Sequence, residues 1–221
     1  MSLRELIQRY IIFALGLAIT SLGIAFSTKS CLGTSPISAI PYALSLALPK
    51  LTIGNWTIIF SVLLIIIQIF ILKKKVKKIE LALQIIITFP FGYMIDLCML
   101  MISQLEPQTY IMRLVFVLIG CVVVAFGVFL QVTGGVVMLP GDAFVRSIAM
   151  KTGKEFGKIR SISDITMTII AFAICLLALG ELTGVREGTV IAALLVGNIV
   201  RVYNKKLSGL RKLLLKGCKY N

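Results

Sequence analysis

The chain has 221 residues, 58% of them hydrophobic, and its mean hydropathy of +1.01 excludes an ordinary soluble domain. The net charge of +14 does not indicate a nucleic-acid partner, because no polar segment is long enough to be a soluble module that carries the basic residues. The sequence has no histidine and no Walker-type phosphate-binding loop, so we expect neither metal nor cofactor, and no enzymatic activity.

Long apolar stretches follow one another along the whole chain. Six of them are long enough to cross a bilayer as helices: roughly residues 10–27, 55–72, 81–103, 113–132, 161–180 and 187–203. The first follows Arg4 and Arg9, as the apolar core of a signal peptide would. A similar apolar stretch at 113–132 lies in the middle of the chain, where it cannot be a signal peptide. We therefore interpret 10–27 as a transmembrane helix that stays in the mature protein. The sequence therefore predicts an all-α integral membrane protein, with a single membrane domain over residues 1–221.

Residues 33–50 form a shorter apolar segment that contains Pro36, Pro41 and Pro49. Its length and its prolines favour a short re-entrant or interfacial helix over a complete crossing. Residues 140–152 occupy the same place after the fourth apolar stretch. We therefore expect six transmembrane helices and two short helices.

The basic residues indicate the orientation of these helices. If the chain crosses six times from a cytoplasmic N-terminus, most of the 23 Lys and Arg lie on the cytoplasmic side, as the positive-inside rule requires. The exceptions are Lys29, Lys50, Arg113 and Arg186. A crossing at 33–50 would instead place the lysine-rich segment 72–78 outside. We expect a multi-pass membrane protein with both termini in the cytoplasm and anionic lipid at the basic inner face.

The two halves of the chain resemble each other at an offset of about 104 residues. Matching positions are Gly16 with Gly120, Gly23 with Gly127, Pro36 with Pro140, Gly54 with Gly157, and Gly92 with Gly197; FPFGYMID (89–96) matches LLVGNIVR (194–201). The predicted repeats span 9–103 and 113–203. Each contains three crossings, an odd number, so the second repeat must be inverted relative to the first. Transporters with inverted repeats bind their substrate between the repeats.

The starts of the two short helices are the candidate binding site. Ser35 suits an N-cap with Pro36 in the first turn, and Pro140 begins the second short helix in the same way. Ser38 and Asp142 then occupy equivalent third positions. The candidate substrate-binding residues are Thr34, Ser35, Ser38, Pro140, Gly141 and Asp142. The alternative is that Ser35, Ser38 and Asp142 only cap two interfacial helices, which explains the residue types equally well.

Four other polar residues are secondary candidates for the site: Asn55, Asp96, Arg160 and Asp164. Asp96 lies about 24 Å along its span, near the outer surface, which favours a solvated interfacial acid. Arg160 and Asp164 are four residues apart and favour a local ion pair on one helix face. The glycines at 16, 23, 120 and 127 predict close packing between the first helices of the two repeats.

The C-terminal tail, residues 204–221, is basic. Between residues 205 and 219 it has six basic residues, no acid, and leucines at 207, 210, 213 and 214. This pattern predicts an amphipathic cytoplasmic helix that lies on the inner leaflet.

TSPISAIPYALS (34–45) and LPGDAFVRSIAMKTGKEFGKIR (139–160) resemble two copies of a segment found in YczE/YitT-type bacterial membrane proteins. That segment has a G-x-G-P-x-D pattern, a short helix and a TGxxxG-like turn. REGTVIAALLVGNIVR (186–201) is similar to the closing GT segment of the same family. Leu139 stands where the pattern has a glycine, and Ser38 stands where it has an acid. The resemblance covers about residues 9 to 203 and implies a shared membrane fold and a location in the bacterial cytoplasmic (cell) membrane.

Together these features favour a secondary-transporter-like or permease-like protein for a small polar solute. The alternative is a non-transporting membrane scaffold or a regulator of a partner protein, in which the repeats serve only packing. A water-accessible cavity at the short helices would favour transport, whereas a solid apolar interior would favour the scaffold.

Overall fold

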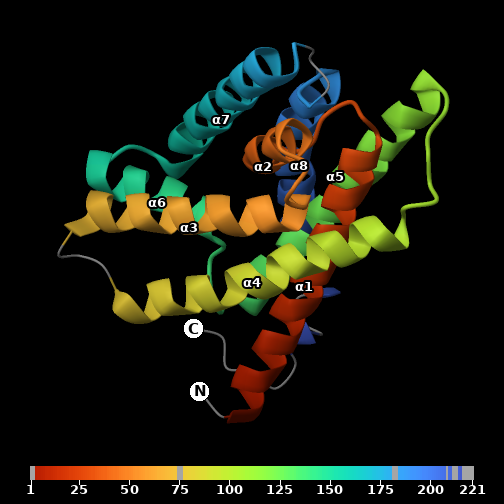
Figure 1. The fold of residues 1–221 in the computed structure, drawn as a ribbon. Helices are drawn as coiled ribbons and strands as arrows, with labels where there is room; N and C mark the ends of the chain where they lie inside the picture. Colours follow the sequence, from red (N-terminus) through yellow and green to blue (C-terminus); the bar gives the residue numbers. More distant parts are fainter. Residues whose placement is uncertain (1–2, 74–76, 181–183, 208, 211–213, 216–221) are drawn as a thin grey trace.

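The computed structural model describes residues 3–73, 77–180, 184–207, 209–210 and 214–215, and this part of the chain contains helices and no strands (Figure 1). The helices are α1 (Leu3–Lys29), α2 (Pro36–Ala47), α3 (Ile53–Leu72), α4 (Lys78–Met101), α5 (Tyr110–Gly134), α6 (Pro140–Thr152), α7 (Phe156–Leu179) and α8 (Glu187–Lys206). In each half of the chain a long helix is followed by a short helix and then by two long helices. The all-α class predicted from the sequence is confirmed for the described residues.

Five of these helices, α1, α3, α4, α5 and α7, are long and apolar enough to cross a membrane. Helix α8 has 20 residues, but Glu187, Asn198 and Arg201 reduce its mean hydropathy, and it is not among the five. The sixth crossing stays a prediction. The short helices α2 and α6 have 12 and 13 residues, as expected for segments that do not span the bilayer.

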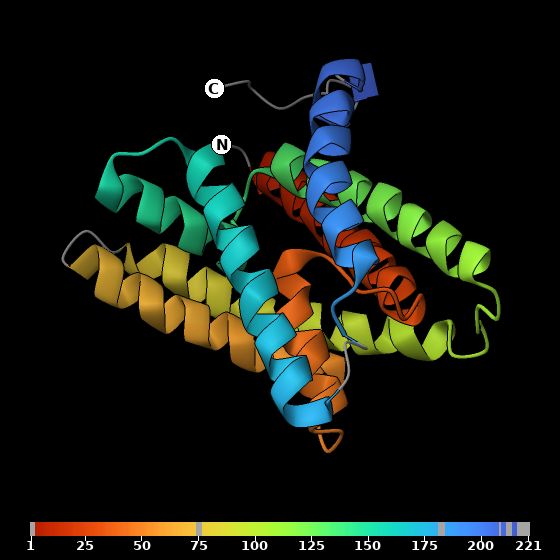
Figure 2. The same ribbon diagram turned by 90° about the horizontal axis from the view of Figure 1, so that it is seen from above.

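Helices α1 and α5 pack against each other along their length, and the four repeated glycines lie in their contact (Figures 1 and 2). A Cβ atom on Gly16 would lie 2.8 Å from the Gly127 carbonyl oxygen, and one on Gly23 would lie 2.6 Å from the Val124 nitrogen. Backbones can approach this closely only where side chains are absent, as in small-residue contacts between membrane helices. The predicted glycine packing is therefore confirmed.

The other helices surround this central pair. Helix α4 contacts α1, and α8 contacts α5. The short helix α2 packs on α7, and the short helix α6 packs on α3. In both views the end of α3, the start of α4 and the turn between α6 and α7 lie on the left, and the α4–α5 connection lies on the right (Figures 1 and 2).

Apolar side chains cover the outer faces of the long helices. Phe70, Ile111 and Leu177 are 73%, 75% and 86% exposed, far more than a water-facing surface tolerates over so many residues. In the described part of the C-terminal tail the leucines are not on the outer surface, because Leu210, Leu214 and Leu215 pack against α1 and α5. Most of the predicted tail helix lies outside the described residues.

Candidate functional site

The two short helices begin as the sequence predicts, with proline in the first turn. Ser35 is the N-cap of α2 and Leu139 that of α6, but neither side chain makes a capping hydrogen bond. The Ser35 hydroxyl instead donates a hydrogen bond to Ser38 Oγ, with 3.2 Å between the two oxygen atoms. The carboxylate of Asp142 pairs with Arg160 rather than with the backbone of its own helix. The capping alternative therefore lacks its hydrogen bonds in the described part of the chain.

The starts of α2 and α6 meet inside the protein, as expected for a pair of half-sites. A Cβ atom on Gly141 would lie 3.1 Å from Ile37 Cδ1, so the first turn of α6 touches the first turn of α2. Pro140, Gly141 and Ser38 are buried at this contact, and Ser35 is half-buried. An apolar side chain, that of Ile37, fills the space between the two helix starts.

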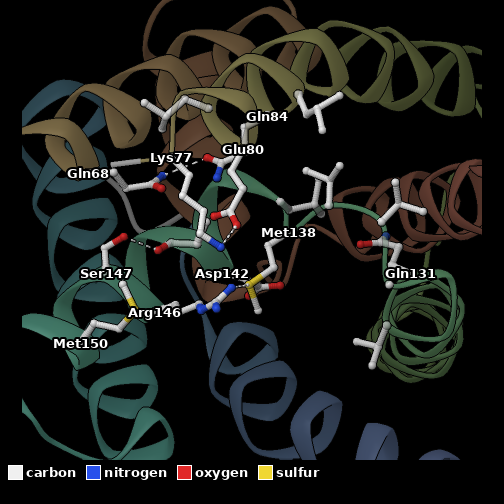
Figure 3. Close-up of a pocket in the computed structure, with 18 of the residues that line it drawn as sticks. Gln68, Lys77, Glu80, Gln84, Gln131, Met138, Asp142, Arg146, Ser147 and Met150 are labelled. Atoms are coloured by element: carbon white, nitrogen blue, oxygen red, sulfur yellow. Dashed lines mark hydrogen bonds and ion pairs between the residues drawn. The ribbon is translucent and has the colours of Figure 1, made fainter. Parts of the chain in front are cut away.

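A cavity of about 560 Å³ lies on one side of this contact, among α3, α4, α5 and α6 (Figure 3). This volume is within the range of small-molecule sites. Its polar lining residues are Gln68, Lys77, Glu80, Gln84, Gln131, Asp142, Arg146 and Ser147. Of the six principal candidates from the sequence, Asp142 alone is among the lining residues. The cavity wall does not include Thr34, Ser35, Ser38, Pro140 or Gly141.

Three buried glutamines supply uncharged polar groups to the cavity wall. Gln68, Gln84 and Gln131 are only 2%, 4% and 7% exposed. Gln68 Nε2 donates to Gln84 Oε1 at 3.2 Å (Figure 3). It also donates to the Pro140 carbonyl oxygen at 3.2 Å. Gln131 Nε2 donates to Thr20 Oγ1 at 2.7 Å. Thus α3, α4 and the start of α6 are joined by one amide network, while the third amide is held by α1.

Each amide in this wall keeps one polar atom free. Gln68 Oε1, Gln84 Nε2 and Gln131 Oε1 make no hydrogen bond to the residues that the structure describes. An amide group with no partner is costly in an apolar interior, so these atoms must meet water or a solute in the cavity. The wall can therefore both accept and donate hydrogen bonds.

Arg160 joins two carboxylates across α6 and α7. Its Nη1 donates to Asp142 Oδ1, and its Nε donates to Asp164 Oδ2 at 3.3 Å. The Arg160–Asp164 pair was expected from the sequence, and Asp142 is an addition that the sequence did not predict. These three side chains are between 19% and 35% exposed. The second oxygen of Asp164 is buried without a hydrogen-bond partner among the described residues.

The remaining candidates lie far from the cavity wall. Asp96 accepts from Thr52 Oγ1 at 2.6 Å and from the Gly54 nitrogen at 2.8 Å, so this α4 carboxylate caps the start of α3. It is therefore a structural acid and not simply a solvated one. Asn55 lies in the same turn, where its backbone nitrogen donates to Thr52 Oγ1.

Thr34 is fully buried in the loop that leads into α2. This loop packs on the first turn of α8, where the Gly188 nitrogen donates to the Leu32 carbonyl oxygen at 2.9 Å. A Cβ atom on Gly188 would lie 2.6 Å from that oxygen, which explains the glycine of the GT segment. The hydroxyl groups of Thr34 and Thr189 are both buried and find no partner in the described residues.

The sequence analysis did not indicate five of the lining residues: Gln68, Gln84, Gln131, Arg146 and Ser147. A signal was present for the amides, because a glutamine is rare within an otherwise apolar stretch of spanning length. Gln68 and Gln84 occur in two adjacent stretches of this kind. No cluster of three His, Cys, Asp or Glu side chains that could hold a metal occurs among the described residues.

Comparison of the sequence with known proteins places the chain in a family. Residues 7–205 match a family of unknown function, DUF6198. The uncharacterized membrane protein YczE of Bacillus subtilis (strain 168) is 28% identical over 200 residues, which cover 90% of this chain and 86% of YczE. The uncharacterized protein YyaS of the same organism is 31% identical over 121 residues, which cover 54% of this chain and 58% of YyaS. No solved structure matches the chain.

Proposed function

The chain belongs to the DUF6198 family and is a YczE-type membrane protein, and we propose that it is a permease-like transporter of a small polar solute rather than an enzyme. The observation that carries the proposal is the cavity along α6, whose wall contains buried amide groups. A membrane scaffold gains nothing from three glutamines around an open space. A binding site for a polar solute needs them, because each free amide atom replaces a hydrogen bond that the solute loses when it leaves water.

The proposal includes six crossings and an inverted repeat, 9–103 and 113–203. The order of long and short helices in each half supports it. Several contacts also come in equivalent pairs: α2 on α7 corresponds to α6 on α3, and α1 with α4 corresponds to α5 with α8. The central α1–α5 contact would then lie on the pseudo-two-fold axis, as inverted repeats require. In this arrangement α8 is the sixth crossing.

The same proposal orients the cavity. The end of α3, the start of α4 and the α6–α7 turn lie on one side of the molecule and carry many of the lysines, so we assign this side to the cytoplasm of a bacterial cell (Figure 2). The cavity is built from these same helix ends and therefore faces inward. The basic residues around it also favour anionic lipid in the inner leaflet.

Cysteine labelling tests whether the cavity is open to water. On a background without cysteines, Gln84→Cys is expected to react with a membrane-impermeant maleimide in inside-out vesicles and not in intact cells. The matched control is Ile86→Cys on the same helix, because Ile86 is 62% exposed on the outer apolar face and its thiol would lie in lipid. A thiol in lipid stays protonated and reacts slowly.

Three outcomes of this labelling experiment can be distinguished. Labelling of Gln84→Cys from the cytoplasmic side alone, with Ile86→Cys unreactive, supports an inward-facing cavity. Equal lack of reaction at both positions would mean a dry interior and would favour the non-transporting scaffold. Reaction of Gln84→Cys from outside would overturn the assigned orientation.

A further inference from the structure

We infer that the solute bound in this cavity is a small organic anion, with a carboxylate or phosphate group as well as uncharged hydrogen-bonding groups. The inference rests on the proposed function and names the substrate class of the same site. The evidence is which charged groups in the cavity wall already have a partner within the protein. A charged group that is already paired is not available to bind a ligand, whereas an unpaired one is.

Four charged side chains line the cavity: Lys77, Glu80, Asp142 and Arg146. Lys77 and Glu80 pair with each other at 3.1 Å (Figure 3). Asp142 pairs with Arg160, which approaches from α7 and is not part of the wall. Each acid of the wall therefore has a neighbouring cation, and Asp142 shares its cation, Arg160, with Asp164.

Arg146 has no acidic partner within the described residues. Its side chain makes one hydrogen bond to the described residues, of 3.5 Å from Nη1 to Met138 Sδ, a weak acceptor (Figure 3). A guanidinium group presents several N–H donors in a plane that matches a carboxylate or phosphate. The wall thus offers one unpaired cation, and no unpaired anion, among the described residues.

The start of α6 adds unpaired backbone N–H groups at the edge of the cavity. The N–H groups of Gly141 and Asp142 donate to no acceptor in the described part of the chain, and they stand at the positive end of a 13-residue helix. The buried glutamines provide the independent sign of a ligand, because Gln84, 96% buried with its Nε2 free, lines the same cavity. An anionic group at Arg146 and a neutral polar part at Gln68 and Gln84 would satisfy both ends of the site.

Matched solutes that differ in charge test the inference on the full chain in a neutral detergent. We would measure the thermal unfolding midpoint with lactate and lactamide, and with glycerol 3-phosphate and glycerol, at an ionic strength held constant with sodium chloride. At least one anion is expected to raise the midpoint more than its neutral counterpart. Arg146→Gln is expected to raise the Kd for that anion by about tenfold or more, the effect of losing a charge-assisted hydrogen bond.

Lys151→Gln is the matched control, because Lys151 is an exposed cation on the same helix and does not line the cavity. Lys151→Gln should leave the Kd unchanged, and Arg146→Lys should restore part of the affinity. Equal losses in Arg146→Gln and Lys151→Gln would mean a general surface-charge effect and would overturn the inference. Stabilisation by lactamide or glycerol equal to that by the anions would also overturn it.

Two further measurements separate the failure of this inference from the failure of the proposed function. If a neutral solute stabilises the protein and Gln84→Leu removes the effect, the permease proposal stands and the anion inference fails. The other source of an anionic group is a lipid headgroup. Phosphatidylglycerol that raises the midpoint through Arg146, relative to phosphatidylcholine and with no effect of soluble anions, would support the anion site and contradict solute transport.

Discussion

The α3–α4 pair and the α7–α8 pair carry glycines at matching positions but pack differently. A Cβ atom on Gly92 would lie 2.7 Å from the Gly54 carbonyl oxygen, so α3 and α4 cross at close contact. The equivalent glycines of the second half lie in open surroundings. A Cβ atom on Gly157 would meet only Glu155 Oε1, at 3.8 Å, and one on Gly197 would meet nothing within 4 Å. Small residues permit a close crossing, but they do not produce it.

The difference follows from one polar position. Asp96 on α4 accepts hydrogen bonds from Thr52 and Gly54, which ties α4 to the unsatisfied start of α3. In the aligned repeats Arg201 stands in the place of Asp96, and Glu155 stands in the place of Thr52. Arginine cannot accept a hydrogen bond, so α8 has no means of capping the start of α7. Accordingly, the N-cap of α7 has no side-chain hydrogen bond.

The largest expected effect on stability comes from adding a side chain where α3 and α4 cross at close contact. Gly54→Ala should destabilise the protein by about 3 kcal/mol, because the new methyl group would overlap the Gly92 backbone and Asp96 and neither can move without separating the helices. Gly157→Ala is the matched control and should cost almost nothing. Equilibrium unfolding in mixed micelles measures both, and equal losses would mean that α7 and α8 pack closely as well.

Removing the carboxylate at the closed crossing should have the next largest effect. Asp96→Ala should cost about 2 kcal/mol, because the Gly54 N–H group and the Thr52 hydroxyl lose their acceptor. Asp96→Asn keeps one acceptor oxygen and should recover about half of the loss. The same unfolding measurement applies. If Asp96→Ala were as stable as the parent protein, the explanation of the close α3–α4 crossing would be wrong.

The short helices also differ between the two halves, and the expected effect on stability is smaller. Asp142 ties α6 to α7 through Arg160, whereas its counterpart Ser38 bonds only within α2. Asp142→Asn should cost about 1 kcal/mol at low salt and less at high salt, because a partly exposed ion pair is screened. Ser38→Ala should show no dependence on salt. A salt-independent loss for Asp142→Asn would point to packing instead of charge.

The smallest effect should have the opposite sign. Gly197→Ala should stabilise the protein by about 0.5 kcal/mol, because alanine favours the interior of a helix and the added methyl group meets no neighbour in this structure. Gly92→Ala, its counterpart, should be destabilising. A loss of stability in Gly197→Ala would show that another helix or a second copy packs there.

Much of the fold follows from local patterns in the sequence. Apolar length predicted the five candidate crossings, and proline with short length predicted α2 and α6. The glycines of α1 and α5 predicted their contact. The open α7–α8 pair could not be predicted from its glycines, because the pattern is the same in both halves and the outcome depends on a polar contact between distant residues.

The candidate site was predicted less completely. The sequence indicated Asp142 and the approach of the two helix starts, which touch at Ile37 and Gly141. It did not indicate the cavity, because the space arises where α3, α4, α5 and α6 fail to fill their common centre. The three glutamines around it are far apart in the chain, so their convergence is a property of the tertiary structure.

The open space beside Gly197 leaves room for α7 and α8 to approach each other. If α7 and α8 closed as α3 and α4 do, Glu155 and Arg201 would occupy the places of Thr52 and Asp96 and could form an ion pair. A disulfide between Glu155→Cys and Arg201→Cys in native membranes would detect that closed pair, and its absence under oxidising conditions would argue against it. In the proposed transporter, closing this pair while α3 and α4 separate would replace the Thr52–Asp96 contact with a Glu155–Arg201 contact. Such an exchange would open the two faces of the membrane in turn.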